Sequence, residues 1–224
     1  FEWAFLMDAF KAERLAKPAL FDPVWNAEVL TQPAAIATAT DFARARDAVV
    51  FFDAGDVQAN GFQIVEDDRL GRTFTETGAS YMGWAVSALL ATAVATKPFH
   101  GLALTGDGSF AMSPQILIDG AAHCARGTIL LLDNRRMGAI SGLQLAQYGH
   151  DHATHDGVEI DYLAWARAVR GVAAFDGGRT LDSLRAALEQ AFAHPGLSLV
   201  HVPVYFGDDP LGGIHVVDSF GSTL

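Results

Sequence analysis

Continuous apolar runs separated by stretches of helical periodicity make up most of the chain after about residue 32. The runs are apolar throughout and do not alternate, which is typical of strands buried on both faces of a sheet; they lie at 48–52, 101–105, 128–133, 171–175 and 197–206. Helices are predicted between them, at 33–47, 82–97, 114–126, 160–169 and 181–194, and a further short strand at 72–77. This alternation predicts an α/β fold, a doubly wound and mainly parallel sheet with helices on both faces.

The two ends of the chain differ from this regular part. Residues 1–31 mix aromatic, basic and proline residues, and we expect an arm or linker with a short amphipathic helix. Residues 32–206 form the predicted domain, and the glycine-rich residues 207–224 form a C-terminal tail. The stretch DAGDVQANG, at 53–61, is predicted to be a turn after the first strand of the domain.

Composition narrows the class of protein. Half of the 224 residues are apolar and 18% are charged, which is enough for a sizeable core. A net charge of −11 without a basic stripe argues against a nucleic-acid surface. The single cysteine, Cys124, excludes a disulfide framework and suits a reducing compartment, so we expect a cytoplasmic protein. The chain starts without Met and without a signal peptide, so we expect a fragment or a missing N-terminus.

Two polar residues follow neighbouring strands of this predicted sheet. Strand 101–105, helix 114–126 and strand 128–133 make one right-handed βαβ unit, so Asp107 and Asn134 both lie past carboxyl ends of parallel strands. Their oxygens favour Mg²⁺ or Ca²⁺, and Mg²⁺ usually completes its coordination with phosphate and water. The pattern therefore fits a Mg²⁺–diphosphate site. Two ordinary turns explain the same residues.

The spacing of these residues resembles a known family. Gly106-Asp107-Gly108, followed after 25 residues by Asn134, is similar to the signature of thiamine diphosphate (ThDP) enzymes. The resemblance implies that the side chains of Asp107 and Asn134 and the carbonyl of Arg136 hold Mg²⁺. Many relatives have a paired Asn-Asn where this chain has Asp133-Asn134.

A second stretch, ETGASYMGWAVSALLAT, resembles the acetolactate-synthase-like group of these enzymes. Met82 lies 25 positions before Asp107 and matches the residue that holds ThDP in its bent form, and the carbonyl of Ser80 matches the acceptor for the cofactor's amino group. FFDAGDVQANG resembles the diphosphate loop, where the acid Asp56 is unfavourable beside phosphate. The implied cofactor-binding residues are Gly55, Asp56, Val57, Gln58, Ser80, Tyr81, Met82, Gly106, Asp107, Gly108, Ser109, Asn134, Arg136, Met137, Gly138 and Ala139. A core methionine is the alternative for Met82.

Three stretches look closer to the trihydroxycyclohexanedione hydrolases than to acetolactate synthase itself: Glu76 to Gly83, LLLDNRRMGAISGLQ and IDYLAWA. The resemblance implies an enzyme that cleaves or forms a C–C bond beside a carbonyl of a 2-oxo or 1,2-diketone substrate. The alternatives are an acetolactate-synthase-like carboligase or 2-oxoacid decarboxylase (a lyase or transferase), and a non-catalytic partner subunit. A non-catalytic subunit would have no need of the intact Asp107, Asn134 and Met82, which argues against that alternative.

The resemblance also implies what this chain lacks. The glutamate that activates ThDP belongs to a pyrimidine-binding domain, which nothing here matches, so no catalytic residue is assigned within this chain. We expect it either as a further domain or as a separate subunit, in a homo- or hetero-oligomer that is a dimer or tetramer. Some relatives carry FAD elsewhere in the full enzyme, which the sequence leaves open.

Weaker signals remain. His150, His152 and His155 fit either a solvated loop or a group facing a metal or substrate. His123 and Cys124 fit packing within a helix, and of Tyr81 and Trp84 we expect one beside the cofactor and one in the core. The tail corresponds to a segment that folds over the active site in relatives, although a frayed terminus has the same composition.

Overall fold

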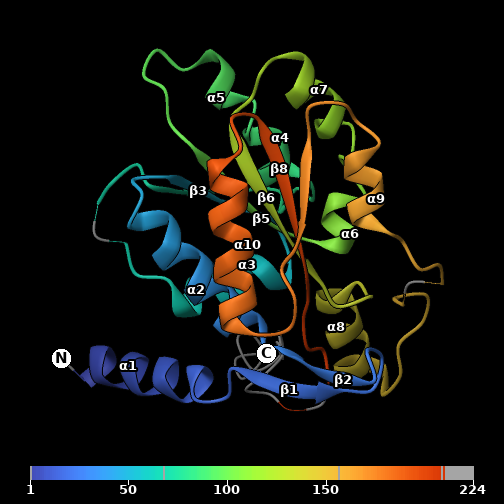
Figure 1. Ribbon diagram of the computed structural model, residues 1–224. Helices are drawn as coiled ribbons and strands as arrows, with labels where there is room; N and C mark the ends of the chain where they lie inside the picture. Colours follow the sequence, from blue (N-terminus) through green and yellow to red (C-terminus); the bar gives the residue numbers. More distant parts are fainter. Residues whose placement is uncertain (1, 68, 156, 208, 210–224) are drawn as a thin grey trace.

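A six-stranded parallel sheet forms the centre of the molecule in the computed structural model, which describes residues 2–67, 69–155, 157–207 and 209 (Figure 1). Its strand order is β4-β3-β5-β6-β8-β7. The strands are β3 (Val49–Phe52), β4 (Thr73–Thr75), β5 (Gly101–Gly106), β6 (Gly127–Asp133), β7 (Ala173–Asp176) and β8 (Leu197–Pro203).

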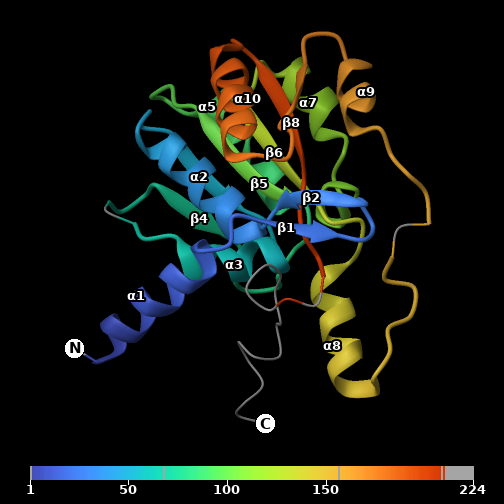
Figure 2. The same ribbon diagram turned by 60° about the horizontal axis from the view of Figure 1, so that its bottom comes forward.

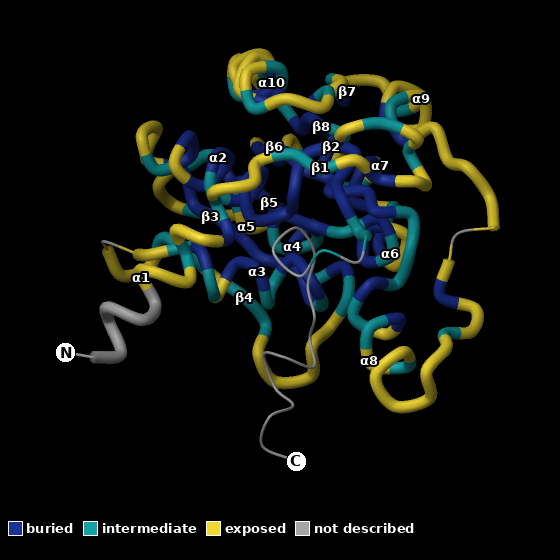
Figure 3. Tube along the Cα trace, turned by 90° about the horizontal axis from the view of Figure 1, so that it is seen from below, coloured by how far each residue is buried: buried dark blue, intermediate teal, exposed yellow. Residues whose placement is uncertain are grey.

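Helices cover both faces of this sheet, because alternate residues of each strand point to opposite sides. On one face, α2 (Gln32–Arg44), α3 (Asp56–Ile64) and α10 (Leu181–Ala193) pack on strand residues such as Val50 and Phe52. On the other, α4 (Trp84–Ala88), α7 (Ile116–Ala122) and α9 (Tyr162–Arg167) pack on residues such as Val49 and Phe51. Figure 3 shows the strands as the buried centre between the two layers. The predicted doubly wound α/β fold is confirmed.

Capping residues fix where several helices begin. The Thr31 hydroxyl accepts from the Ala34 N–H before α2, and Asp161 accepts from the Ala164 N–H at 2.8 Å before α9. Thr180 and Ser183 bond each other's backbone N–H in a capping box at α10. These local hydrogen bonds explain why the starts of these helices lie close to the predicted ones.

The stretch predicted as a turn after β3 is mostly helix. Gly55, with φ at +83°, makes the turn alone, and α3 begins at Asp56. The buried residues Val57, Asn60, Gly61 and Ile64 have the i, i+3, i+4, i+7 spacing of a helix face, a pattern that the turn-forming residues beside them obscured.

The helix predicted over 82–97 is two short ones. The N–H groups of Leu89 and Leu90 donate to carbonyls three residues back, which tightens the chain between α4 and α5 (Ala91–Val94). Leu89 is fully buried there. Helices α6 (Asp107–Phe110) and α8 (Gly138–Tyr148) were not predicted.

The N-terminal arm contains α1 (Glu2–Leu15) and an antiparallel hairpin of β1 (Ala19–Asp22) and β2 (Ala27–Leu30). Both lie at the end of the sheet where α8 also lies (Figures 1 and 2). The Tyr205 N–H donates to the Leu30 carbonyl at 2.8 Å, and the Phe206 N–H donates to Asp22 Oδ2 at 2.9 Å. These bonds fasten the hairpin to the chain after β8. The hairpin was not predicted.

The predicted C-terminal tail, 207–224, lies outside the described residues except for Gly207 and Asp209. Among the helices that are described, none combines the length and apolar character needed to span a membrane.

His100 makes the stability of the fold depend on pH. Its ring stacks on Phe192 with centroids 4.0 Å apart, and Nε2 lies 3.0 Å from Thr128 Oγ1. Burial, helped by the charge of Arg126, lowers the pKa of His100 from 6.5 to about 4. Folding therefore favours the neutral ring. The contribution of His100 to the unfolding free energy is complete above pH 6.5. It is lost progressively towards pH 4, because the unfolded chain takes up the proton at a higher pH than the folded one.

We expect His100→Gln to remove this acid-sensitive part of the unfolding free energy, at most about 3 kcal/mol. Urea unfolding of both proteins across the range from neutral pH to the lowered pKa of His100 measures it. His123→Gln, at an exposed helix end, is the control and should keep the wild-type pH dependence. Identical pH profiles for wild type and His100→Gln would contradict the prediction.

Candidate functional site

A cavity of about 370 Å³ opens at the carboxyl edge of the sheet, between the segments that follow β3, β5 and β6. In-register pairing of β5 with β6, which places Gly106 opposite Leu132, brings the turns after these strands to one place. The lining residues are Gln32, Ala54, Gly55, Asp56, Val57, Ser80, Met82, Gly106, Asp107, Gly108, Ser109, Leu132, Asn134, Arg136, Met137, Gly138, Ala139, Ile140 and Leu143.

All but two of the residues implied as cofactor-binding line this cavity. The exceptions are Gln58 and Tyr81. The Gln58 amide donates to Thr75 Oγ1 and to the Glu76 carbonyl, away from the cavity, and Tyr81 is 60% exposed. Trp84 packs edge-on against Phe51 in the core. Five lining residues were not predicted: Gln32, Ala54, Leu132, Ile140 and Leu143.

The residues implied as metal ligands lie together on the cavity wall. Asp107 and Asn134 are buried, and Asn134 Oδ1 accepts from the Arg136 N–H at 3.2 Å. Among the described residues no three His, Cys, Asp or Glu side chains gather as a metal cluster. One carboxylate, one amide and one backbone carbonyl form an oxygen-only set, which fits Mg²⁺ that takes its other ligands from diphosphate and water.

Met82 reaches the same wall from another loop. A Cβ on Gly108 would lie 3.7 Å from Met82 Cε, an ordinary contact, and 2.5 Å from Met137 Sδ, so a side chain at position 108 would displace the end of Met137. Ser80 holds φ at +52° and Arg135 at +60°, an uncommon conformation for residues other than glycine. Such backbone conformations cluster at functional sites.

The position of Met82 depends on a residue that was not predicted. Asp53 is fully buried at the end of β3, where Oδ1 accepts from the Gly83 N–H at 2.8 Å and Oδ2 from Thr105 Oγ1 at 2.7 Å. Burial raises the pKa of Asp53, while these hydrogen bonds oppose that shift. Asp53 thus joins β3 and β5 to the segment that presents Met82. An acid directly after an apolar strand was the available signal.

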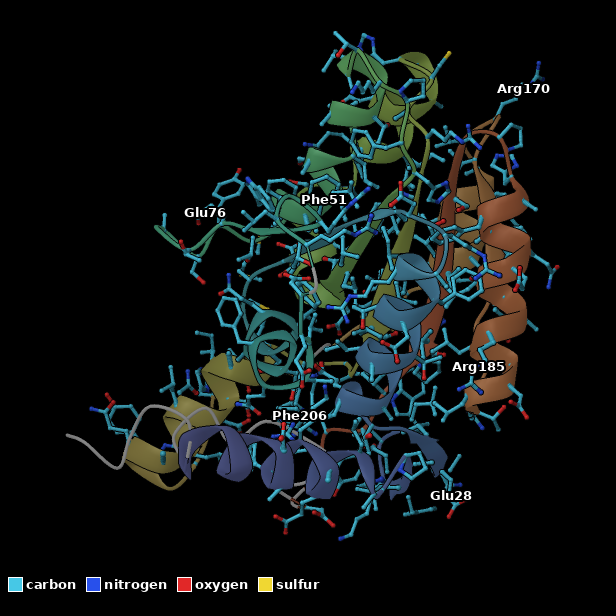
Figure 4. The ribbon with its side chains drawn as sticks, turned by 90° about the vertical axis from the view of Figure 1, so that its left-hand side faces the viewer. Glu28, Phe51, Glu76, Arg170, Arg185 and Phe206 are labelled. Atoms are coloured by element: carbon cyan, nitrogen blue, oxygen red, sulfur yellow. The ribbon has the colours of Figure 1, made fainter. Side chains whose placement is uncertain are left out.

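Glu76 shapes the outer part of the same segment (Figure 4). Its carboxylate accepts from the N–H groups of Gly78, Ala79 and Tyr81, and these bonds lower its pKa. The loop that contains Ser80 is therefore wrapped around an acidic side chain, which gives a physical reason for the Glu-x-Gly-x-Ser pattern.

Asp56 lies at the start of α3 and is 7% exposed. Burial raises its pKa to about 7, and the Asn134 amide beside it opposes that shift without reaching good hydrogen-bond geometry. A Cβ on Gly138 would lie 1.9 Å from Asp56 Oδ2, so this glycine makes room for the acid.

The sequence of this domain matches one known family. Residues 53–202, more than half of the chain, match the family model "Thiamine pyrophosphate enzyme, C-terminal TPP binding domain". The chain belongs to the thiamine pyrophosphate enzymes.

Curated relatives are similar over much of this TPP-binding domain. A 3D-(3,5/4)-trihydroxycyclohexane-1,2-dione hydrolase of Bacillus velezensis is 29% identical over 165 residues, which cover 70% of this chain and 25% of the relative. The protein of that name from Listeria monocytogenes is 30% identical over 184 residues, covering 78% and 28%. The chain thus spans about a quarter of these relatives' length.

Solved structures show the same fold. A benzoylformate decarboxylase from Polynucleobacter necessarius superposes with a TM-score of 0.69 at 19% identity, covering 78% of this chain and 33% of that one. A 4-hydroxybenzoylformate decarboxylase of Rhodococcus jostii RHA1 gives 0.68 at 20% identity, covering 80% and 33%.

The Asp133 that replaces the first Asn of the paired family motif does not line the cavity of the TPP-binding domain. Its Oδ2 lies 2.8 Å from His201 Nε2, and its Oδ1 accepts from the Arg135 N–H at 3.0 Å. Asp133 therefore supports the turn that carries Asn134 from behind.

The histidine-rich loop supports the same turn. Asp151 accepts hydrogen bonds from Ser141 Oγ and Thr154 Oγ1, and it lies 2.9 Å from His155 Nε2. These contacts, the Ser141 bond most of all, lower the pKa of Asp151 to about 2. The Met137 N–H donates to the Thr154 carbonyl at 2.7 Å. His150 and His152 are exposed, as expected of a solvated loop, and no group of three or more His, Cys, Asp or Glu side chains that could hold a metal occurs among the described residues.

Asp53→Ala should loosen the Met82 segment of this TPP-binding domain. It removes the buried acceptor for the Gly83 N–H, so we expect a loss of about 1–3 kcal/mol in unfolding free energy and faster amide exchange at Gly83 and Ala85. Asp176→Ala is a matched control, because Asp176 also ends a strand and accepts a backbone N–H but is exposed. Equal losses in both variants would show that Asp53 has no special role.

Proposed function

We propose that this domain binds ThDP with Mg²⁺ and forms part of an enzyme that cleaves a C–C bond beside a carbonyl, with a cyclic 1,2-dione as substrate. One observation carries the proposal: Asp107, Asn134 and Met82 come from three separate segments and meet at one cavity in a chain of this family. The names of the curated relatives support the dione hydrolase among the alternatives.

Each wall of the cavity has a role in this proposal. Asp107, Asn134 and the Arg136 carbonyl would hold Mg²⁺, which would supply positive charge for the diphosphate. Gly106 and Gly108 would let the diphosphate approach the backbone, and Met82 would support the cofactor from the opposite segment. When bound, ThDP supplies a nucleophilic carbon and an electron sink for chemistry beside a carbonyl.

A second domain or subunit completes the site in this proposal. Ile140 and Leu143 of α8 line the cavity but remain 45% and 47% exposed, and Leu145 and Tyr148 on the same helix are also exposed. A pyrimidine-binding domain placed against α8 would bury these side chains and exclude water from the cavity.

Calorimetric titration of ThDP into the whole protein, with Mg²⁺ or with EDTA, tests the cofactor site. We expect binding that depends on Mg²⁺ and that Asp107→Ala weakens by at least about tenfold, because the metal loses a direct ligand. Asp182→Ala, which removes an exposed carboxylate, is the control and should bind like wild type. ThDP binding that does not need Mg²⁺, or wild-type affinity in Asp107→Ala, would argue against the proposed Mg²⁺ site.

Product analysis tests the reaction. The whole protein should consume a cyclic 1,2-dione with ring opening, whereas carbon dioxide or acetolactate from pyruvate would support the alternative carboligase or decarboxylase. The 224-residue chain alone should show no turnover, because the activating glutamate is expected on another domain. Turnover by this chain alone would contradict that expectation. Cofactor binding without turnover of either substrate by the whole protein would favour the non-catalytic partner.

A further inference from the structure

Gln32 is a buried polar residue on the cavity wall that belongs to none of the family motifs. It is the first residue of α2 and is 2% exposed. Its Oε1 accepts from Asn60 Nδ2 at 3.0 Å, and its Nε2 donates to none of the described residues. Because Gln32 lines the cavity, its amide is positioned to meet a ligand there.

The orientation of this amide is set from the N-terminal arm. Arg14 of α1 is 3% exposed, and its guanidinium donates to Asn60 Oδ1 and, at 3.0 Å, to Gln63 Oε1. Asn60 is fully buried on α3 between Arg14 and Gln32. A continuous chain of hydrogen bonds therefore runs from α1 through α3 to the cavity.

The donor and acceptor groups fix the direction in which these hydrogen bonds run from Arg14 to Gln32. A guanidinium has donors and no acceptor, so the Asn60 atom facing Arg14 must be its oxygen. The Asn60 amide nitrogen then faces Gln32, which must present its oxygen there. What remains towards the cavity is the Gln32 N–H₂ group, a pure donor.

We infer that Gln32 Nε2 donates a hydrogen bond to a phosphoryl oxygen of the ThDP diphosphate, and that Asn60 and Arg14 are its positioning residues. This inference rests on the proposed function. A donor suits an anionic oxygen, and hydrogen bonds to charged groups are the stronger ones. It also makes the arm, through Arg14, part of the cofactor site.

The sharpest test reverses donor and acceptor in the hydrogen bond between residue 60 and Gln32. Asn60→Asp keeps an acceptor for Arg14 but has no donor, so the Gln32 amide turns its nitrogen to the new carboxylate and its oxygen to the cavity. We expect the Kd for ThDP with Mg²⁺, measured by calorimetry on the whole protein, to rise about tenfold. Gln32→Met is similar in shape to Gln32 but has no donor, so its Kd for ThDP should rise by a similar factor. In both variants the Kd for inorganic pyrophosphate with Mg²⁺ should also rise by a similar factor.

Matched variants separate positioning from simple stability. Arg14→Lys keeps a donor towards Asn60 and should bind ThDP nearly as wild type, whereas Arg14→Met should bind more weakly. Gln63→Ala removes an acceptor of Arg14 that is not in the chain of hydrogen bonds leading to Gln32, and should leave the Kd unchanged. The unfolding free energy of Asn60→Asp should not fall below that of Gln63→Ala, because the introduced carboxylate pairs with Arg14.

The outcomes distinguish this inference from the function on which it rests. Wild-type affinity in both Asn60→Asp and Gln32→Met, with Mg²⁺-dependent binding still lost in Asp107→Ala, would overturn the role of Gln32 and leave the cofactor site standing. If the wild-type protein binds no ThDP with Mg²⁺, both are overturned.

Discussion

The in-register parallel pairing of β5 with β6 is the constraint on which the site depends. Pairing begins with Gly101 opposite Gly127, where a Cβ on Gly127 would lie 2.7 Å from the Gly101 carbonyl oxygen, and it ends with Gly106 opposite Leu132. A parallel ladder sends both chains out at the same edge, so Asp107 and Asn134 leave the sheet side by side. A shift of one residue would turn the alternating side chains of one strand to the wrong face and separate the two.

Buried and half-buried acids then hold the loops at that edge. Asp53 holds the segment before α4, Asp133 the turn around Asn134, and Asp151 the loop that supports Met137. Taking a carboxylate out of water is unfavourable unless hydrogen bonds replace its solvation, and each of these groups accepts at least two. The loops are therefore fixed by specific partners before any ligand arrives, which is the preorganisation that tight anion and metal binding requires.

The site is also open on one side. Helix α8 carries exposed apolar side chains next to the cavity, and the chain spans about a quarter of the curated relatives that it matches. In the proposed function, these exposed apolar side chains are where the second domain would pack. The arm also contributes to this end of the molecule, since Arg14 and the hairpin are hydrogen-bonded to the domain.

The fold class, the strands of the central sheet and the positions of Asp107 and Asn134 after two of those strands could be predicted from the sequence, because apolar runs and turn residues act over short distances along the chain. The prediction was wrong at the start of α3, where glycine and acidic residues looked like a turn although buried residues had helical spacing. That Asp53 holds Gly83, and that Arg14 reaches Gln32 through Asn60, follows only from how distant segments pack in the folded molecule. These contacts join residues at least 28 positions apart, and no local pattern encodes which distant partner a buried polar group will meet.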